Sequence, residues 1–347
     1  MTDFPEPMKD NADDIVEAPL THSLFTLFSL IVFLCFMGCM NGCNSDHTGS
    51  VLRSSQPGTS LPPVTLASGV DSPYGIAVDS TNVYWMENTP NGSVKKVSLT
   101  GGAVTSLATG LKNPTRIAAD PASIYWTEYG TKVNDGAVKK VRKDGGPVTV
   151  LALGLNHPYG IAVDSDYVYW TEYGTYGKNN SGAVKKMRID DGTVTLLASG
   201  LYHPYELAVD STRVYWTDDN GTVTTTPISG GAPKILAAGL SQPYGIGVDA
   251  TSVYWTENAG AIRKVPIGGG DITNLVSGLK KPYGIAVDYN WVYWTEYFGG
   301  AVRKTDKNGR VVMTLVSGST NPAAITVDSA SVYYTESFGR TVMKVAK

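Results

Sequence analysis

PYGIAVDSDYVYWTE, residues 158–172, decides the fold, because close copies of this stretch fill most of the chain. The copies align on a proline and recur every 39 to 46 residues, beginning at Pro73, Pro114, Pro158, Pro204, Pro243, Pro282 and Pro322. A period near 40 residues is typical of solenoids and propellers. The sequence therefore predicts a repeat architecture over most of its 347 residues.

Each repeat contains four segments of strand character and no competing helical periodicity. An apolar run such as GIAVD leads through a short turn into VYWTE, which is rich in β-branched and aromatic residues. A segment of the GAVKKV type, a glycine-containing turn and a segment of the VTLLASG type follow. Four strands in an antiparallel meander predict one blade of a β-propeller.

The order of the strands predicts how the ring closes. Strands one to three occur seven times, and so does the fourth-strand pattern, but its first copy, Val64 to Gly69, precedes the first proline. We expect Val64 to Gly69 to be the outer strand of the last blade, which leaves no open ring edge. The predicted fold class is all-β: a seven-bladed propeller of four-stranded antiparallel blades, in one domain over residues 61–347.

Residues 1–60 have a different composition. Six acidic residues and one lysine precede Ser23, and Leu24 to Met40 is almost wholly apolar. This run is shorter than the roughly 20 residues of a membrane span and indicates a signal-peptide core. We therefore interpret residues 1–43 as an export segment and residues 44–60 as a flexible linker. Because signal peptides begin with positive charge, the acidic start indicates a true start codon near Leu24.

The three cysteines, Cys35, Cys39 and Cys43, lie in or just after the apolar run. Gly38-Cys39 and Gly42-Cys43 resemble the lipobox of bacterial lipoproteins, although the residues before each glycine depart from its usual pattern. The resemblance implies lipidation at Cys39 or at Cys43, while signal cleavage without a lipid and an uncleaved anchor stay open. The expected location is the cell envelope or the extracellular space, and the cysteine-free repeats predict neither a disulfide nor a zinc site.

Charge argues against nucleic acid as a partner. Residues 61–347 hold 26 of the 28 basic and 24 of the 31 acidic residues, a net charge of +2. Basic pairs recur on third strands, and we expect them to pair with the repeated glutamates: Lys95-Lys96, Lys139-Lys140, Lys185-Lys186, Arg263-Lys264 and Arg303-Lys304. With no coiled coil in the sequence, we expect a monomer that meets a membrane only through its N-terminal anchor.

The motif Tyr-Trp-Thr-Glu, which is Tyr-Trp-Thr-Asp at residues 215–218, resembles the YWTD repeats of lipoprotein-receptor propellers and, more loosely, NHL and TolB-like propellers. The resemblance implies a propeller, but receptor-type YWTD propellers usually have six blades. Repeated residues are expected to be structural: each tryptophan packs between blades, and an aspartate that ends each first strand caps the next turn. These aspartates are Asp79, Asp120, Asp164, Asp210, Asp249, Asp288 and Asp328.

The repeats also resemble those of seven-bladed streptogramin lyases, which implies histidine, glutamate and Mg²⁺ at the mouth of the ring. Here no histidine follows the prolines; the residues at that position are Tyr74, Thr115, Tyr159, Tyr205, Tyr244, Tyr283 and Ala323. His157 and His203 precede their prolines, and we expect them to be solvated loop residues. The sequence therefore predicts no catalytic residue, no metal ligand and no cofactor; a Mg²⁺ or Ca²⁺ ion is expected only if the protein is an enzyme.

Departures from the repeat indicate a binding site. The proline loops (fourth strand to first) and the post-glutamate loops (second strand to third) should share one end of the ring, here called the proline face. There, Arg116 and Glu206 replace the glycine of other blades, and the post-glutamate loops are longest in blades two and three. We hypothesise a ligand site over blades two to four, formed by Arg116, Glu206, Tyr129, Tyr159, Tyr173, Tyr176 and Tyr205. The alternative is that Arg116 and Glu206 simply pair with each other or with neighbours.

These observations favour an exported ligand-binding or scaffold module whose partner is a protein, a peptide or a carbohydrate. The alternative is a propeller enzyme, either a metal-dependent lyase or a lactonase-like hydrolase that uses carboxylates at the channel mouth. A structural role at the cell surface is a third possibility.

Overall fold

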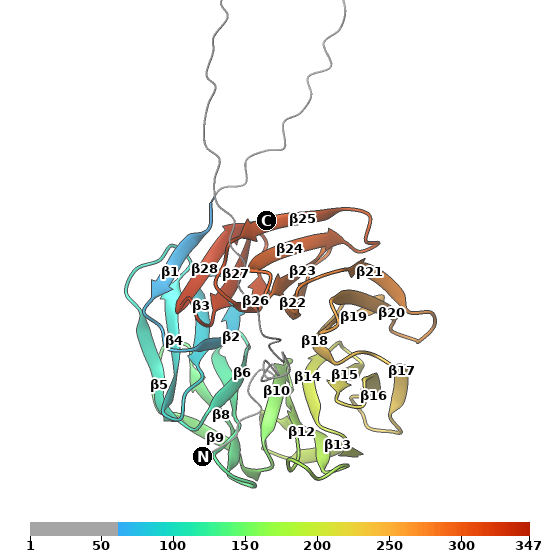
Figure 1. Ribbon diagram of the computed structural model, residues 1–347. Coiled ribbons are helices and arrows are strands. Elements are labelled where there is room, and N and C mark those ends of the chain that lie inside the picture. The colour runs from blue at the N-terminus through green and yellow to red at the C-terminus, as the bar shows by residue number, and fades with distance from the viewer. Residues whose placement is uncertain (1–61) are drawn as a thin grey trace, which may run out of the picture. The chain divides into compact units, whose positions relative to one another are not determined.

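A computed structural model of the chain describes residues 62–347, so the predictions about the export segment, the linker, Cys39 and Cys43 lie outside the described residues. The described residues form 28 strands in seven four-stranded sheets arranged as a ring (Figure 1). The predicted seven-bladed propeller is confirmed. Within this range no helix has the length and apolar character needed to cross a bilayer.

In six blades the strands run outward from the channel in chain order, and in the last blade β1 is the outer strand (Figure 1). The inner strands are β2 (Pro73–Val78), β6 (Pro114–Ala119), β10 (Pro158–Val163), β14 (Pro204–Val209), β18 (Pro243–Val248), β22 (Pro282–Val287) and β26 (Pro322–Val327). The second strands are β3 (Asn82–Glu87), β7 (Ser123–Glu128), β11 (Tyr167–Glu172), β15 (Arg213–Asp218), β19 (Ser252–Glu257), β23 (Trp291–Glu296) and β27 (Ser331–Glu336).

The third and fourth strands complete the blades. The third strands are β4 (Gly92–Ser98), β8 (Gly136–Arg142), β12 (Gly182–Arg188), β16 (Thr222–Pro227), β20 (Ala261–Pro266), β24 (Ala301–Asp306) and β28 (Thr341–Ala346). The outer strands are β5 (Thr105–Leu111), β9 (Thr149–Leu155), β13 (Val194–Leu201), β17 (Lys234–Ala237), β21 (Thr273–Ser277), β25 (Val312–Ser317) and β1 (Val64–Ser68).

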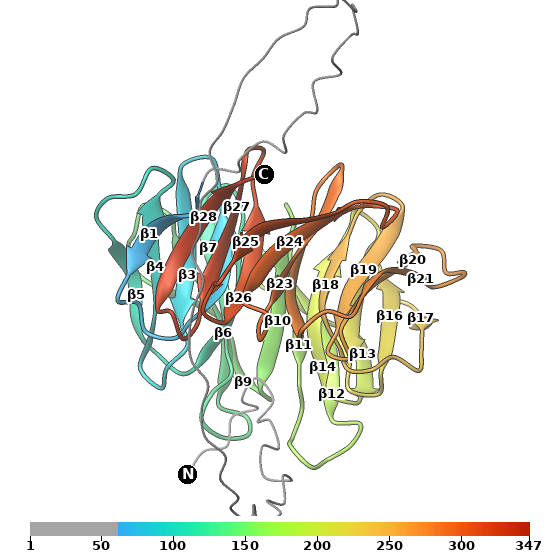
Figure 2. The ribbon, with the colours of Figure 1, turned by 45° about the horizontal axis from the view of Figure 1, so that its top comes forward.

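The ring closes between the two ends of the described chain. Strand β1 pairs antiparallel with β28, with Val64 opposite Lys344 and Ser68 opposite Thr341, so the last blade has the order β1-β28-β27-β26 (Figure 2). Leu66 of β1 is buried in a cluster with Trp85 and Tyr333. The expected closure by Val64 to Gly69 is therefore found, with the strand ending one residue earlier, at Ser68.

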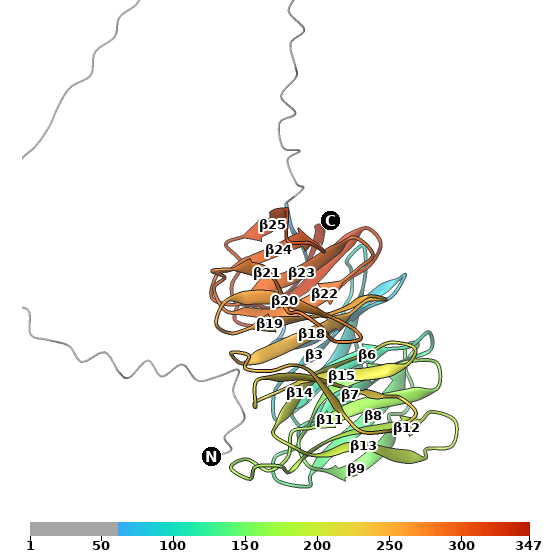
Figure 3. The same cartoon turned by 90° about the vertical axis from the view of Figure 1, so that its right-hand side faces the viewer.

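The core lies between neighbouring blades, which follow one another around the ring (Figure 3). Tyr84 and Met86 of blade one, for example, pack against Ile117 and Trp126 of blade two. All seven residues at the tryptophan position have no exposed surface: Trp85, Trp126, Trp170, Trp216, Trp255, Trp294 and Tyr334. Burial of such large side chains supplies much of the hydrophobic stabilisation, and their predicted structural role is confirmed.

The repeated aspartates cap the turn between the first and second strands, as predicted. Asp164 Oδ1 accepts hydrogen bonds from the backbone N–H groups of Asp166 and Tyr167, at 2.8 and 2.7 Å. Its Oδ2 accepts from the Tyr169 hydroxyl at 2.7 Å. An aspartate suits this turn because its short side chain can reach backbone donors two and three residues ahead.

The repeated threonine joins each blade to the next. Thr171 Oγ1 accepts from the Gly160 N–H at 2.8 Å and donates to the Tyr205 carbonyl of the following blade at 2.7 Å. Six blades have this interblade bond, and blade one has Met86 instead of threonine. The carbonyl that Met86 cannot bond, that of Thr115, accepts from Arg116 Nη1 at 3.0 Å.

Candidate functional site

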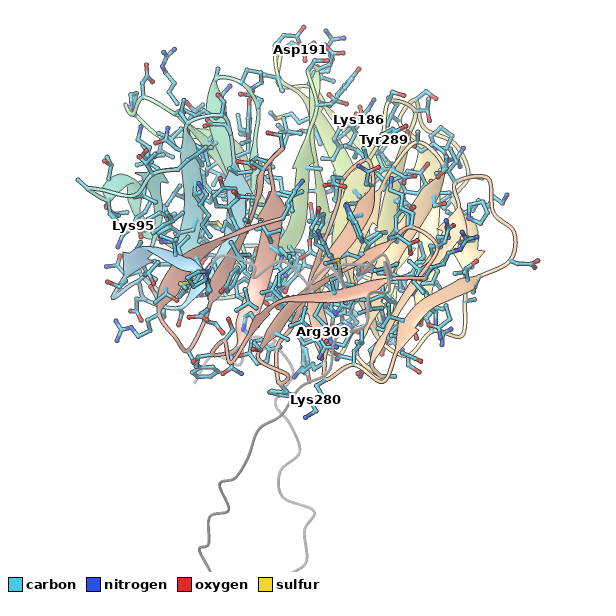
Figure 4. All side chains as sticks on the ribbon, turned by 90° about the horizontal axis from the view of Figure 1, so that it is seen from above. Lys95, Lys186, Asp191, Lys280, Tyr289 and Arg303 are labelled. Atoms are coloured by element: carbon cyan, nitrogen blue, oxygen red, sulfur yellow. The ribbon has the colours of Figure 1, made fainter. Side chains whose placement is uncertain are left out.

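The proline loops and the post-glutamate loops meet on one face, as expected from chain direction. Tyr173 N–H donates to the His157 carbonyl at 2.9 Å, and Tyr297 N–H donates to the Lys281 carbonyl at 2.9 Å. Figure 4 shows Lys280, in a proline loop, on one face of the ring, and Asp191 and Tyr289, in turns between strands, on the other. A ligand bound on the proline face would therefore contact loops from several blades.

The glutamates of blades one, two, three, five and six on this face are buried and already bonded. Glu128, which is 1% exposed, accepts from Trp126 Nε1 at 3.1 Å, Lys112 N–H at 3.2 Å and Lys139 Nζ at 2.9 Å. The first basic residue of each pair bonds its own blade's glutamate, as predicted: Lys95–Glu87, Lys139–Glu128, Lys185–Glu172, Arg263–Glu257 and Arg303–Glu296. These glutamates hold the loops in place.

The metal chemistry of the lyases does not fit these residues. The position after each proline carries no histidine, and five glutamates already bind a lysine or arginine. Within residues 62–347 no three His, Cys, Asp or Glu side chains are grouped closely enough to hold a metal ion. We therefore derive no step through a metal.

A layer of tyrosines closes the channel near the proline face. The hydroxyl of Tyr74 lies 3.1 Å from that of Tyr159 and 3.0 Å from that of Tyr244, and it also contacts the hydroxyl of Tyr283. These four tyrosines come from the inner strands of blades one, three, five and six, and each is at most 9% exposed. Burial raises the pKa of Tyr159 and Tyr244 well above the usual value, so both hydroxyls stay protonated.

Arg116 and Glu206 meet at the centre of this layer. Arg116 Nε donates to Glu206 Oε1, and Arg116 Nη2 donates to the hydroxyls of Tyr244 and Tyr159 at 2.6 and 3.2 Å. The guanidinium carbon lies 4.4 Å from the Tyr74 ring centroid, a cation–π distance. The structure thus contains the pairing that the sequence left as the alternative, and it brings Tyr159 to the same pair. We call Arg116, Glu206 and the four tyrosines the channel plug.

A row of aromatic rings extends from the plug across blades four, three and two. Tyr205 lies 5.7 Å from Tyr159 and 5.5 Å from Tyr173, and Tyr173 lies 6.4 Å from Tyr129. Tyr129 and Tyr173 are only 5% and 4% exposed, so they support the surface and do not form it. Tyr176, in the post-glutamate loop of blade three, is 78% exposed.

The expectation that His157 and His203 are solvated was wrong, because they are 8% and 5% exposed. The backbone φ angle is positive at both residues, 53° at His157 and 49° at His203. This conformation directs each imidazole ring toward the tyrosine that follows the glutamate in the preceding blade. The His157 ring stacks on Tyr129 at 4.4 Å, and the His203 ring lies 4.2 Å from Tyr173. Both histidines therefore pack between blades.

Blades four and seven lack the basic residue that pairs with the second-strand carboxylate in the other five blades, and blade seven has Met343 at that position. Thr224 pairs with Trp216 at the register position where Lys95 pairs with Trp85, so Asp218 has no cation from its third strand. Asp218 accepts from the Thr222 hydroxyl at 2.7 Å, and its neighbour Asp219 accepts from the Tyr173 hydroxyl at 3.4 Å. Burial raises the pKa of both carboxyl groups.

Two buried nitrogens in blade four also lack partners within the described part of the chain, namely His203 Nδ1 and Trp216 Nε1. Their counterparts in blade three are satisfied: His157 Nδ1 lies 2.9 Å from the Gly174 carbonyl, and Trp170 Nε1 donates to Glu172 at 3.3 Å. The sequence reasoning missed Asp218 and Asp219 as a local departure. The signal was present in the adjacent acids at 218–219 and in the TVTTTP strand without lysine.

Comparisons with known proteins support the fold. No protein-family model and no curated protein matches the sequence. Virginiamycin B lyase from Staphylococcus aureus is similar in structure, with a TM-score of 0.69 at 18% identity, covering 82% of this chain and 98% of that chain. A streptogramin B lyase has a TM-score of 0.68 at 19% identity, covering 82% and 96%. A nidogen/laminin complex has a TM-score of 0.49 at 24% identity, covering 58% and 80%. At these identities the likeness shows the propeller fold alone.

Proposed function

We propose that this protein is an exported binding module whose ligand site lies on the proline face over blades two to four. The proposal rests on two carboxylates of blade four that have no basic partner among the described residues and lie beside the aromatic row. In five other blades a basic residue pairs with the carboxylate that ends the second strand. In blade four Asp218 and Asp219 have no such partner within residues 62–347, and Asp219 and Tyr205 are only half-buried.

These groups suit a ligand that donates hydrogen bonds and offers a flat apolar face. Asp219 supplies the acceptor, Tyr205 supplies an aromatic edge, and exposed Tyr176 extends the surface over blade three. Sugars and peptide segments both have this combination of groups, and tyrosine is enriched where proteins bind them. The channel plug forms the floor beside this surface, with its charges paired internally.

The test is binding of the full-length protein to arrays of immobilised oligosaccharides and of peptides. We expect Tyr176→Ala and Asp219→Asn each to weaken binding about 10-fold. Tyr289→Ala is the matched control, because Tyr289 is 90% exposed on the opposite face. If both site variants bind every probe as well as the Tyr289→Ala protein does, the proposed site is wrong.

A carboxylate-dependent hydrolase is the second candidate, and Asp219 is the observation that favours it. Burial raises the pKa of this carboxyl group, as a general acid requires, and no basic side chain pairs with it within the described part of the chain. Turnover of chromogenic esters and lactones by the wild type, lost in the Asp219→Asn protein, would support this role. The metal-dependent lyase is not proposed, because its ligand residues are missing.

Export and lipid anchoring rest on the apolar run and its cysteines. We expect mass spectrometry of the mature protein to find an N-terminus within residues 35–44 and a diacylglyceryl group on Cys39, or on Cys43. Cys39→Ser and Cys43→Ser proteins, labelled with a radioactive or clickable palmitate, distinguish the two positions. An intact N-terminus without lipid in the wild type would contradict both parts of this proposal.

A further inference from the structure

A cavity occupies the channel behind the plug. Its volume is about 120 Å³, and its walls include five isoleucines from the inner strands: Ile76, Ile117, Ile246, Ile285 and Ile325. Each of these side chains lies two residues beyond the position after the proline, so the cavity extends from the plug toward the opposite face. The cavity is partly open to solvent, so a ligand bound in it need not lie wholly inside it.

One end of this cavity is charged, because Arg116 and Glu206 also line it. The pair is monodentate: Arg116 Nε bonds Glu206 Oε1, and within residues 62–347 no hydrogen bond is made by Glu206 Oε2. A guanidinium has five N–H donors, and those of Arg116 make one bond from Nε, one from Nη1 and two from Nη2. One N–H of Arg116 Nη1 and the Oε2 atom of Glu206 therefore have no hydrogen-bond partner within residues 62–347.

Arg116 is also held rigidly for such a role. Its side chain is only 10% exposed, and bonds to the Thr115 carbonyl and to the hydroxyls of Tyr159 and Tyr244 fix the guanidinium plane. A fixed guanidinium binds a carboxylate with less loss of conformational entropy than a mobile one. The other inner strands have glycine at this position in blades one, three, five and six, so the charged end is particular to blades two and four.

We propose that the channel cavity binds a free α-amino acid with an aliphatic side chain. Its ammonium group would donate to Glu206 Oε2, its carboxylate would accept from Arg116 Nη1, and its side chain would lie among the isoleucines. A zwitterion adds one positive and one negative group beside the existing pair, so no buried charge loses its partner. The inference goes beyond the proposed function, because the cavity lies behind the plug and not on the proline face.

The test is calorimetric titration and thermal shift of the full-length protein with L-leucine. We expect saturable binding and a raised melting temperature. The half-ligands 4-methylpentanoate and 3-methylbutylamine, each lacking one charged group, should bind about 10-fold or more weakly, because a hydrogen bond to a charged group is lost. No binding of L-leucine, or equal binding of either half-ligand, overturns the proposal.

Two variants locate the site. Ala324→Leu should fill the cavity and abolish leucine binding, because Ala324 lines it while Arg116 and Glu206 are left unchanged. Ala330→Leu, in an exposed turn of the same blade, is the matched control and should bind as the wild type does. Glu206→Gln, which keeps the size of the side chain, should weaken leucine binding about 10-fold through the lost charge. Unchanged leucine binding by folded Ala324→Leu protein places the ligand elsewhere and refutes the assignment.

Discussion

Replacement of Thr171 by valine tests whether the interblade threonines stabilise the ring. The Thr171 hydroxyl has no exposed surface, accepts from Gly160 N–H at 2.8 Å and donates to the Tyr205 carbonyl at 2.7 Å. Valine has a similar shape, so the change removes these two hydrogen bonds and leaves little empty space. An unsatisfied buried donor costs about 1–3 kcal/mol, and a lost hydrogen bond costs about 1 kcal/mol.

The expected loss for Thr171→Val is therefore about 2–4 kcal/mol of unfolding free energy. For a protein of this size we expect the melting temperature to fall by roughly 3–7 °C. Urea unfolding followed by tryptophan fluorescence measures the loss, since Trp170 and its equivalents are buried between blades. The slope of the transition should stay the same, because the surface exposed on unfolding is unchanged.

The control is Thr212→Val, because the Thr212 hydroxyl bonds Asp210 at 2.8 Å in an exposed turn. A surface change of this kind usually alters stability by less than about 0.5 kcal/mol. If Thr171→Val is no less stable than Thr212→Val, the reasoning about interblade hydrogen bonds is refuted.

Three further predictions concern the site, the turns and the closure of the ring. Burial raises the pKa of Asp219, so ionisation of this carboxyl group destabilises the fold above the unfolded pKa of about 3.9. Asp219→Asn should therefore raise the melting temperature at pH 7.5 but not at pH 3.5. Equal shifts of the melting temperature at both pH values would contradict this. Burial opposes ionisation of Asp249, but hydrogen bonds from Lys307, Thr251 and Ser252 hold its pKa below the usual value. The ionised Asp249 carboxylate thus stabilises the fold above a pH of about 4, and this stabilisation is lost as the pH falls. Asp249→Asn should therefore lower the melting temperature at pH 7 and much less at pH 2. Melting curves at the two pH values measure the difference. Leu66→Ala should lower the free energy of unfolding by about 2–4 kcal/mol. It should also speed hydrogen exchange in β28 more than in β20, because Leu66 of β1 is buried at the closing blade. Exchange that rises equally in both strands would rule out a local effect on ring closure.

The repeat made the fold readable from the sequence. Each copy carries the same four strand patterns, so blade number, strand order and closure by β1 followed without the structure. The aspartate caps and lysine–glutamate pairs were also predictable, because both form within one blade between residues at most 13 positions apart. Such local contacts do not depend on the dimensions of the ring.

Contacts across the channel were harder to predict. Arg116 and Glu206 are 90 residues apart, and their meeting depends on the width of the channel, which no local pattern encodes. The burial of His157 and His203 depends on a positive φ immediately before a proline, a conformation that sterics disfavour there. The unpaired acids of blade four could have been found, because the missing lysine is visible once the third strands are aligned.

The pairing of β1 with β28 sets the order of events when the protein is made. Val64 and Lys344 are partners, so the first described strand leaves the ribosome 280 residues before the strand that completes its sheet. At the usual rates of translation this delay is roughly 14–56 s. During that time Leu66 can contact Trp85 of blade one, but β1 has no hydrogen-bonded partner strand. Synthesis of β28 is thus the step that allows β1 to pair and the ring to close.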